Sequence, residues 1–197
     1  MVWAALQDLD LGELRDRDSV SLRYSWPLAP FYGLVCQSPQ TLHAGQKAPH
    51  LDDFADLAAL HYLTHWQPAS GAVEGAGGTA FYAQRATGAA RFGAKECTTL
   101  ETAGVSSHLC QHSHAFNCTM GLGDQAGCKP EQRAFKQSYQ TSSDENFVLL
   151  HVVPHAFNRA IIYSAKQLHS AFIDAASLKT LSCDPKVGRL TANLFFD

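Results

Sequence analysis

The chain has 197 residues, of which 46% are hydrophobic and 17% are charged, and its formal net charge is −3. This composition is typical of one globular domain with a packed core, so we expect a single domain over residues 1–197. Lysine and arginine total only 15 and form no basic run, which argues against a nucleic-acid or anionic-membrane partner. The N-terminus lacks the basic segment of a signal peptide, and no stretch has the ~20 apolar residues of a membrane span. We therefore expect a soluble, cytoplasmic protein whose six cysteines are reduced.

Short runs of β-forming residues dominate the predicted secondary structure. Residues 5–16 have the apolar spacing of a short amphipathic helix. Residues 56–66 are long enough for a helix, but they end in His, Tyr, Thr and Trp and are counted as a strand. The other candidate strands are residues 31–37, 78–85, 147–153, 158–164, 167–172 and 188–196. With the segment around His50 they make about eight strands, which indicates a sandwich or barrel such as the jelly roll.

Residues 94–146 interrupt this pattern and are expected to form an insertion or lid on the barrel rather than a second domain. They are polar and contain four of the six cysteines, and residues 130–140 begin with a proline typical of a helix start. The histidines and cysteines of residues 97–128 are a second possible metal site, for zinc. The cysteines there are separated by 13, 8 and 10 residues, without the closely paired ligands of structural zinc sites, which favours ordinary thiols. A Cys–His nucleophile pair has no supporting motif.

Three residues could together bind a metal ion. His50 and Asp52 are two positions apart, so on a strand both side chains point to the same face. This pair is a weak signal alone. His169, which begins a later candidate strand, would complete the two-histidine, one-carboxylate set of non-haem Fe(II) oxygenases. The alternative for His169 is a half-buried strand histidine bonded to a carbonyl.

The last candidate strand carries polar residues on a face that should be apolar. Arg189, Thr191, Asn193 and Phe195 share one face, because alternate residues of a strand point the same way. A guanidinium beside a hydroxyl could bind the distal carboxylate of a dicarboxylic cosubstrate through hydrogen bonds. The alternative is an arginine at a strand end that reaches solvent.

The order of five motifs resembles that of the 2-oxoglutarate/Fe(II)-dependent oxygenase superfamily, and most closely its prolyl-hydroxylase-like branch. These motifs are "PHLD", "GGTAFY", "FNRAIIY", "LHS" and "GRLT". They are especially similar to those of an uncharacterised bacterial family in that superfamily, and the resemblance covers roughly residues 31–197. It implies a double-stranded β-helix (jelly roll), here with the short N-terminal helix and the long insertion.

The resemblance also implies roles for individual residues. The implied Fe(II) ligands are His50, Asp52 and His169. Arg189 would bind the distal carboxylate of the cosubstrate 2-oxoglutarate, with Tyr62 and Thr191 in support. Asn193 and Phe195 would line the same cavity. The implied activity is hydroxylation of a C–H bond in a small-molecule or peptide substrate.

One departure from the superfamily pattern leaves a second candidate for the anchor. Arg189 follows His169 by 20 residues, which is longer than usual, so residues 173–187 would form an extra loop. Lys179 lies at the usual spacing, and some members use lysine. We favour Arg189 because its surroundings have the pattern of a strand. Two other functions remain open: a non-catalytic small-molecule or sugar-binding protein on this scaffold, and a cupin-like metalloenzyme that does not use 2-oxoglutarate.

Overall fold

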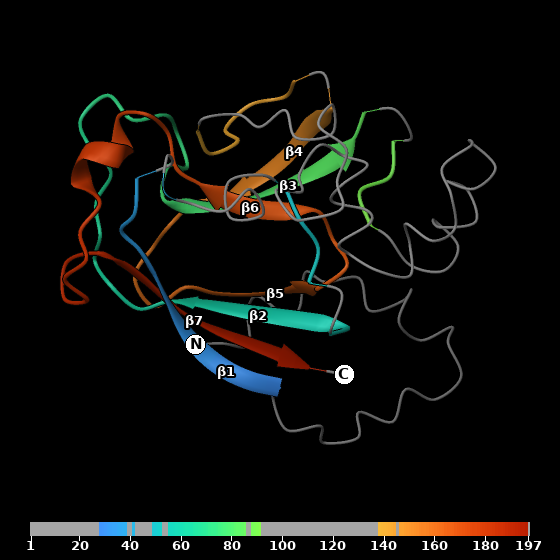
Figure 1. The fold of residues 1–197 in the computed structure, drawn as a ribbon, viewed down its shortest axis with the longest axis horizontal. Coiled ribbons are helices and arrows are strands. Elements are labelled where there is room, and N and C mark those ends of the chain that lie inside the picture. The colour runs from blue at the N-terminus through green and yellow to red at the C-terminus, as the bar shows by residue number, and fades with distance from the viewer. Residues whose placement is uncertain are drawn as a thin grey trace.

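The structure, a computed structural model, describes residues 28–38, 41, 49–52, 55–85, 88–91, 138–144 and 146–196. These residues form two antiparallel β-sheets that lie as two layers (Figure 1). The first sheet has the order β1 (Leu28–Val35), β7 (Arg189–Phe196), β2 (Leu57–Tyr62) and β5 (Ala160–Ser164). The second has the order β4 (Phe147–Val153), β3 (Gly78–Gln84) and β6 (His169–Phe172). A single-turn 3₁₀ helix η2 (Ser177–Thr180) lies between β6 and β7. Because the other described elements are all strands, the mainly-β prediction is confirmed.

The strands fall where the β-forming runs predicted them, and the run at residues 56–66 is a strand rather than a helix. His50 lies at the outer edge of the second sheet. It forms a β-bridge with His169, in which His50 N donates to His169 O at 2.9 Å and His169 N donates to His50 O at 3.1 Å. The segment around His50, which the sequence analysis counted among its eight candidate strands, therefore pairs with β6.

Apolar residues of the two sheets make the core. One cluster, from β3, β4 and β6 and the residue before β6, contains Ala80, Tyr82, Phe147, Leu168 and Phe172. A smaller cluster, near β2 and β7, contains Ala55, Ala58, Ala165 and Phe195. β3 is the central strand of its sheet and is buried on both faces, which explains its nearly continuous run of apolar residues. Phe172 of β6 is buried in the larger cluster, so its truncation to alanine should lower the free energy of unfolding by about 3–5 kcal/mol.

Several predicted features lie outside the described residues: the helix at 5–16, most of the insertion at 94–146, and the cysteine- and histidine-rich residues 97–128. The end of the insertion is described and packs on β3, because the Tyr82 hydroxyl donates to the backbone oxygen of Gln140 at 2.7 Å. Residues 138–140, the end of the helix predicted over 130–140, are not helical. Among the described helices, none has the length and apolar character of a membrane span.

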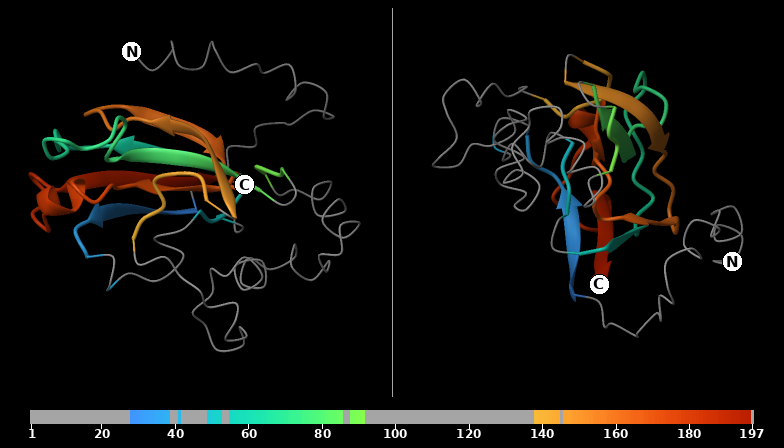
Figure 2. Two further views of the ribbon diagram at one scale, coloured as in Figure 1. Left: turned by 90° about the horizontal axis from the view of Figure 1, so that it is seen from above. Right: turned by 90° about the vertical axis from the view of Figure 1, so that its right-hand side faces the viewer.

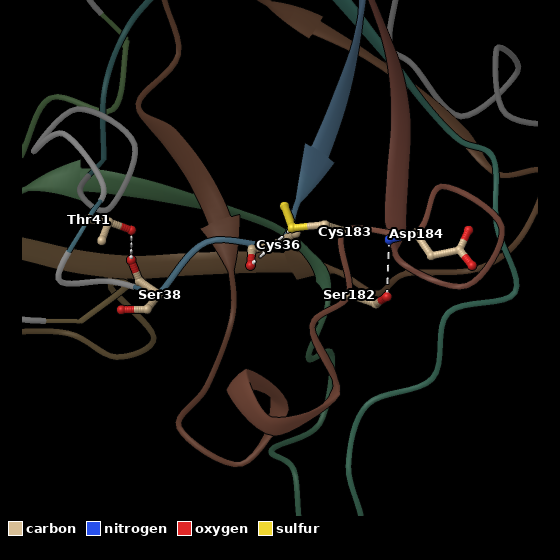
Figure 3. Close-up of a disulfide and its surroundings, with 6 residues drawn as sticks. All are labelled: Cys36, Ser38, Thr41, Ser182, Cys183 and Asp184. Carbon is tan, nitrogen blue, oxygen red and sulfur yellow. Dashed lines mark hydrogen bonds between the residues drawn. A yellow bond between two sulfur atoms is a disulfide. The ribbon is translucent and has the colours of Figure 1, made fainter.

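The expectation of six reduced cysteines is wrong for one pair. Cys36 directly follows β1, and Cys183 lies in the connection from β6 to β7; they form a disulfide with their Cα atoms 4.9 Å apart (Figure 3). The pairing of β1 with β7 sets Val35 opposite Arg189, and this brings the two cysteines together across 147 residues of sequence. Figure 2 shows β1 (blue) beside β7 (red) in its right-hand view.

Candidate metal centre and buried arginine

The backbone brings the three predicted metal ligands to one edge of the second sheet. The bridge to His169 fixes His50, and Asp52 N donates to Ala165 O at 2.9 Å. Since His50 and Asp52 are two residues apart, both can turn toward His169 at the start of β6.

The side chains of His50, Asp52 and His169 converge, each offering one donor atom within 4.8 Å of the others. His169 Nε2 lies 3.3 Å from Asp52 Oδ2, and the two imidazole rings have centroids 4.6 Å apart. We expected the donors to lie within about 3–4 Å of one another, as a shared ion requires. The Asp52–His169 pair meets this, whereas the group as a whole is looser.

The protonation of the group suits a divalent metal. His169 Nδ1 donates to the carbonyl oxygen of Gln167 at 2.8 Å, which leaves Nε2 facing Asp52. Burial works to raise the pKa of Asp52. The hydrogen bond to His169 and the charges of His169 and His50 outweigh it and hold the pKa below its usual value. An anionic carboxylate and the imidazole Nε2 therefore meet at this point, where a metal ion would take the place of the proton between them, so the residues fit a bound metal ion.

Arg189 crosses from one sheet to the other at the beginning of β7. It is 3% exposed. Its Nε donates to Gly77 O, and its Nη2 donates to Gly78 O at 3.1 Å, both at the start of β3. Its Cζ lies 5.5 Å from the ring centroid of Tyr62. Among the described residues, no carboxylate pairs with this guanidinium, and burial lowers its pKa.

A glycine turn presents the two carbonyls that hold Arg189. In the turn before β3, Gly75 and Gly77 have positive φ angles of 83° and 81°. A Cβ atom on Gly77 would strike the ring of Trp66, and one on Gly78 would strike the backbone oxygen of Val153. Only glycine allows this close approach.

Tyr62 and Thr191 lie beside the arginine as a directly opposed pair on β2 and β7. Tyr62 is fully buried, and its hydroxyl is 2.7 Å from Thr79 Oγ1 on the opposite sheet. The Thr191 hydroxyl donates to Gly33 O at 3.3 Å and accepts from Asn193 Nδ2 at 3.2 Å. Thr191 and Asn193 therefore share a face of β7, as expected, but their polar atoms already have partners within the sheet.

The two other predicted residues of this part are Phe195 and Lys179. Phe195 belongs to the smaller core cluster and stacks on Phe31 with ring centroids 5.8 Å apart. Lys179, the alternative anchor, is exposed on η2. Of the two candidate anchors, only Arg189 is buried between the sheets.

Three residues that the sequence analysis did not single out also adjoin the site. The ring of Tyr163 packs edge-on against His169, with centroids 4.8 Å apart, and its pKa is raised by burial and by the charge of Asp52. Tyr139 is buried close enough to Arg189 for the two to interact, and burial raises its pKa to about 12. His155 packs against Tyr62. The alternation of side chains along β5 could have predicted that Tyr163 points inward. Tyr139 and His155 lie in connections, where no such alternation exists.

The strand register gives the spacing between the metal ligands and the arginine. His169 is opposite Phe81, whereas Gly78, which accepts from Arg189, is opposite Phe172 at the other end of β6. Three residues of strand separate these points, which is about 10 Å. Tyr163 lies in the same region, since the charges of both Asp52 and Arg189 act on its pKa. The register thus places the metal ligands and the held guanidinium near opposite ends of β6.

The described residues thus define a two-sheet β-protein with a His-Asp-His group and a buried guanidinium that pairs with no described carboxylate. The sequence model of the DUF6445 family, described as a family of unknown function, matches residues 17–116 and 122–196. The chain belongs to this family. Searches of curated proteins and of solved structures gave no match.

Proposed function

We propose that this protein is an Fe(II)- and 2-oxoglutarate-dependent oxygenase that hydroxylates a C–H bond of a small-molecule or peptide substrate. One observation carries the proposal: a His-Asp-His group occurs about 10 Å along the sheet from a buried guanidinium that pairs with no described carboxylate. A permanently charged guanidinium is costly to bury alone, so an incoming carboxylate is its natural partner.

The strand order supports a double-stranded β-helix as the scaffold. If the segment at His50 is counted as a strand beside β6, each sheet has four strands. The orders are then β1-β7-β2-β5 and β4-β3-β6-His50. Among the described strands the chain changes sheet at almost every connection, and only β3 and β4 are consecutive strands of the same sheet. Two packed four-stranded antiparallel sheets are the layout of a jelly roll.

The metal ion would be held by His50, Asp52 and His169. Bound Fe(II), with 2-oxoglutarate and O₂, supplies the oxidising chemistry of hydroxylation, while 2-oxoglutarate becomes succinate and CO₂. The protein holds Asp52 as a carboxylate, and the contact of His169 Nδ1 with Gln167 O turns Nε2 toward the same point.

Arg189 would bind the distal carboxylate of 2-oxoglutarate with those N–H groups that do not donate to Gly77 and Gly78. Its contacts with those carbonyls hold the guanidinium in one orientation before the ligand arrives, which lowers the entropy cost of binding. Tyr62 and Tyr163 form apolar walls around this part and keep water from the ion pair.

Calorimetry tests the proposal. Purified protein is first titrated with Mn(II), an inert substitute for Fe(II), and then with 2-oxoglutarate. The proposal predicts one Mn(II) per chain and 2-oxoglutarate binding that depends on the metal. Metal binding without 2-oxoglutarate binding would favour the cupin-like alternative, and binding of neither would favour a non-catalytic binding protein.

A further inference from the structure

His155, in the connection between β4 and β5, has a buried ring nitrogen without a partner. Its Nε2 is shielded from solvent, and among the described residues no group is within hydrogen-bonding distance of it. Buried polar groups in native proteins are almost always paired, so an orphaned one calls for a partner that the chain itself does not provide.

The surroundings of His155 are also those of Arg189. The His155 ring packs edge-on against Tyr62, with centroids 4.9 Å apart, and against Trp66, at 5.7 Å. Tyr62 is the ring that Arg189 faces. Trp66 fills the space beside Gly77, whose carbonyl accepts from Arg189. An imidazole nitrogen and a guanidinium, neither with a described anionic partner, therefore share Tyr62 as a neighbour, and Trp66 adjoins the glycine whose carbonyl accepts from Arg189.

The charges around His155 keep it neutral. Burial first, and then the positive charges of Arg189, Arg159 and His65, lower its pKa to about 4. Near neutral pH the ring therefore carries one proton and can donate one hydrogen bond from Nε2. Each charged group that acts on the ring is cationic, so the partner best suited to this place is an anion.

Resting on the proposed function, we infer that His155 is a positioning residue for the cosubstrate. Its Nε2–H donates to the same distal carboxylate that Arg189 binds. A carboxylate accepts several hydrogen bonds, so one group can satisfy both the fork of Arg189 and the orphaned nitrogen. His155 thereby makes the site selective for 2-oxo acids that end in a second carboxylate over monoacids of the same length.

The experiment compares two acids in three proteins. Mn(II)-loaded wild type, His155→Phe and His155→Gln are titrated by calorimetry with 2-oxoglutarate and with 2-oxopentanoate, in which a methyl group replaces the distal carboxylate. Phenylalanine preserves the aromatic packing and removes the donor, whereas glutamine retains an N–H. Thermal melting of each protein checks that it is folded.

We expect His155→Phe to bind 2-oxoglutarate about 10- to 100-fold more weakly, the effect of losing one hydrogen bond to a charged group. Its affinity for 2-oxopentanoate should not change, and His155→Gln should recover most of the loss. An equal loss for both acids, or no loss for 2-oxoglutarate, would overturn the inference while leaving the proposed function intact. If wild type binds no 2-oxoglutarate, both are overturned.

A second measurement does not depend on the phenylalanine variant. In protein labelled with ¹⁵N-histidine and loaded with Zn(II), addition of 2-oxoglutarate should shift the Nε2 resonance of His155, assigned by its absence in His155→Gln. Addition of 2-oxopentanoate should leave that resonance in place. No shift with 2-oxoglutarate, under conditions where it binds, would contradict the hydrogen bond.

Discussion

Replacing both Cys36 and Cys183 with serine should destabilise the fold, mainly because the unfolded chain gains conformational entropy when the disulfide is lost. The disulfide joins residues 147 apart, and the chain-entropy relation for a loop of that size gives about 5 kcal/mol at 25 °C. Cys183 is exposed and Cys36 is only partly buried, so little packing is lost with the sulfurs. For a chain of this length, 5 kcal/mol corresponds to a fall in Tm of about 10–20 °C.

The assay is thermal and urea denaturation of wild type and of the Cys36→Ser/Cys183→Ser variant, each with and without dithiothreitol. The reductant should lower the Tm of wild type to that of the variant and leave the variant unchanged. A fall in Tm of under about 2 °C in the variant would refute the loop-entropy reasoning. Disulfides are rare in reducing compartments, so peptide mapping of this bond in protein isolated from its cells would also test the expected cytoplasmic location.

Three further predictions concern the site. Asp52→Ala should weaken Mn(II) binding at least about tenfold in calorimetry, because the only carboxylate ligand is lost, and unchanged affinity would contradict the metal assignment. Arg189→Lys should bind 2-oxoglutarate at least about tenfold more weakly, since an ammonium lacks the guanidinium fork, whereas Lys179→Ala should bind normally; the reverse result would move the anchor to Lys179. His155 has a pKa near 4 when folded and an ordinary value of 6.5, so the unfolded chain binds the extra proton and stability should fall as pH falls from 6.5 to 4. His155→Phe should lose that part of the pH dependence in urea titrations, and an unchanged slope would argue against a neutral, buried imidazole.

The strands were predictable because the apolar period that identifies them is local. The run at 188–196 alternates and the run at 78–85 is nearly continuously apolar, as a strand buried on both faces requires, and their bounds agree with β7 and β3 to within one residue. Residues 56–66 were ambiguous, because a short apolar run suits a helix as well as a buried strand. This segment forms the strand β2 because it pairs with β5 and β7, and such pairing between distant parts of the chain cannot be predicted from the local sequence.

The candidate site was predictable where its residues lie on strands. Alternation puts Arg189 on the inward face, and the two-residue spacing of His50 and Asp52 puts both side chains on one face. The disulfide and the orphaned nitrogen of His155 were missed for a different reason. Cys36 and Cys183 meet only through the β1–β7 register, and His155 lies in an aperiodic connection whose path depends on its contacts with β2.

An anaerobic titration with Fe(II) followed by 2-oxoglutarate tests the central claim most directly. If His50, Asp52 and His169 hold the metal and Arg189 holds the far carboxylate, a weak visible charge-transfer band should appear on adding 2-oxoglutarate. The band should saturate at one equivalent per chain and be absent from Asp52→Ala. Bound Fe(II) that gives no such band at saturating 2-oxoglutarate would contradict the account.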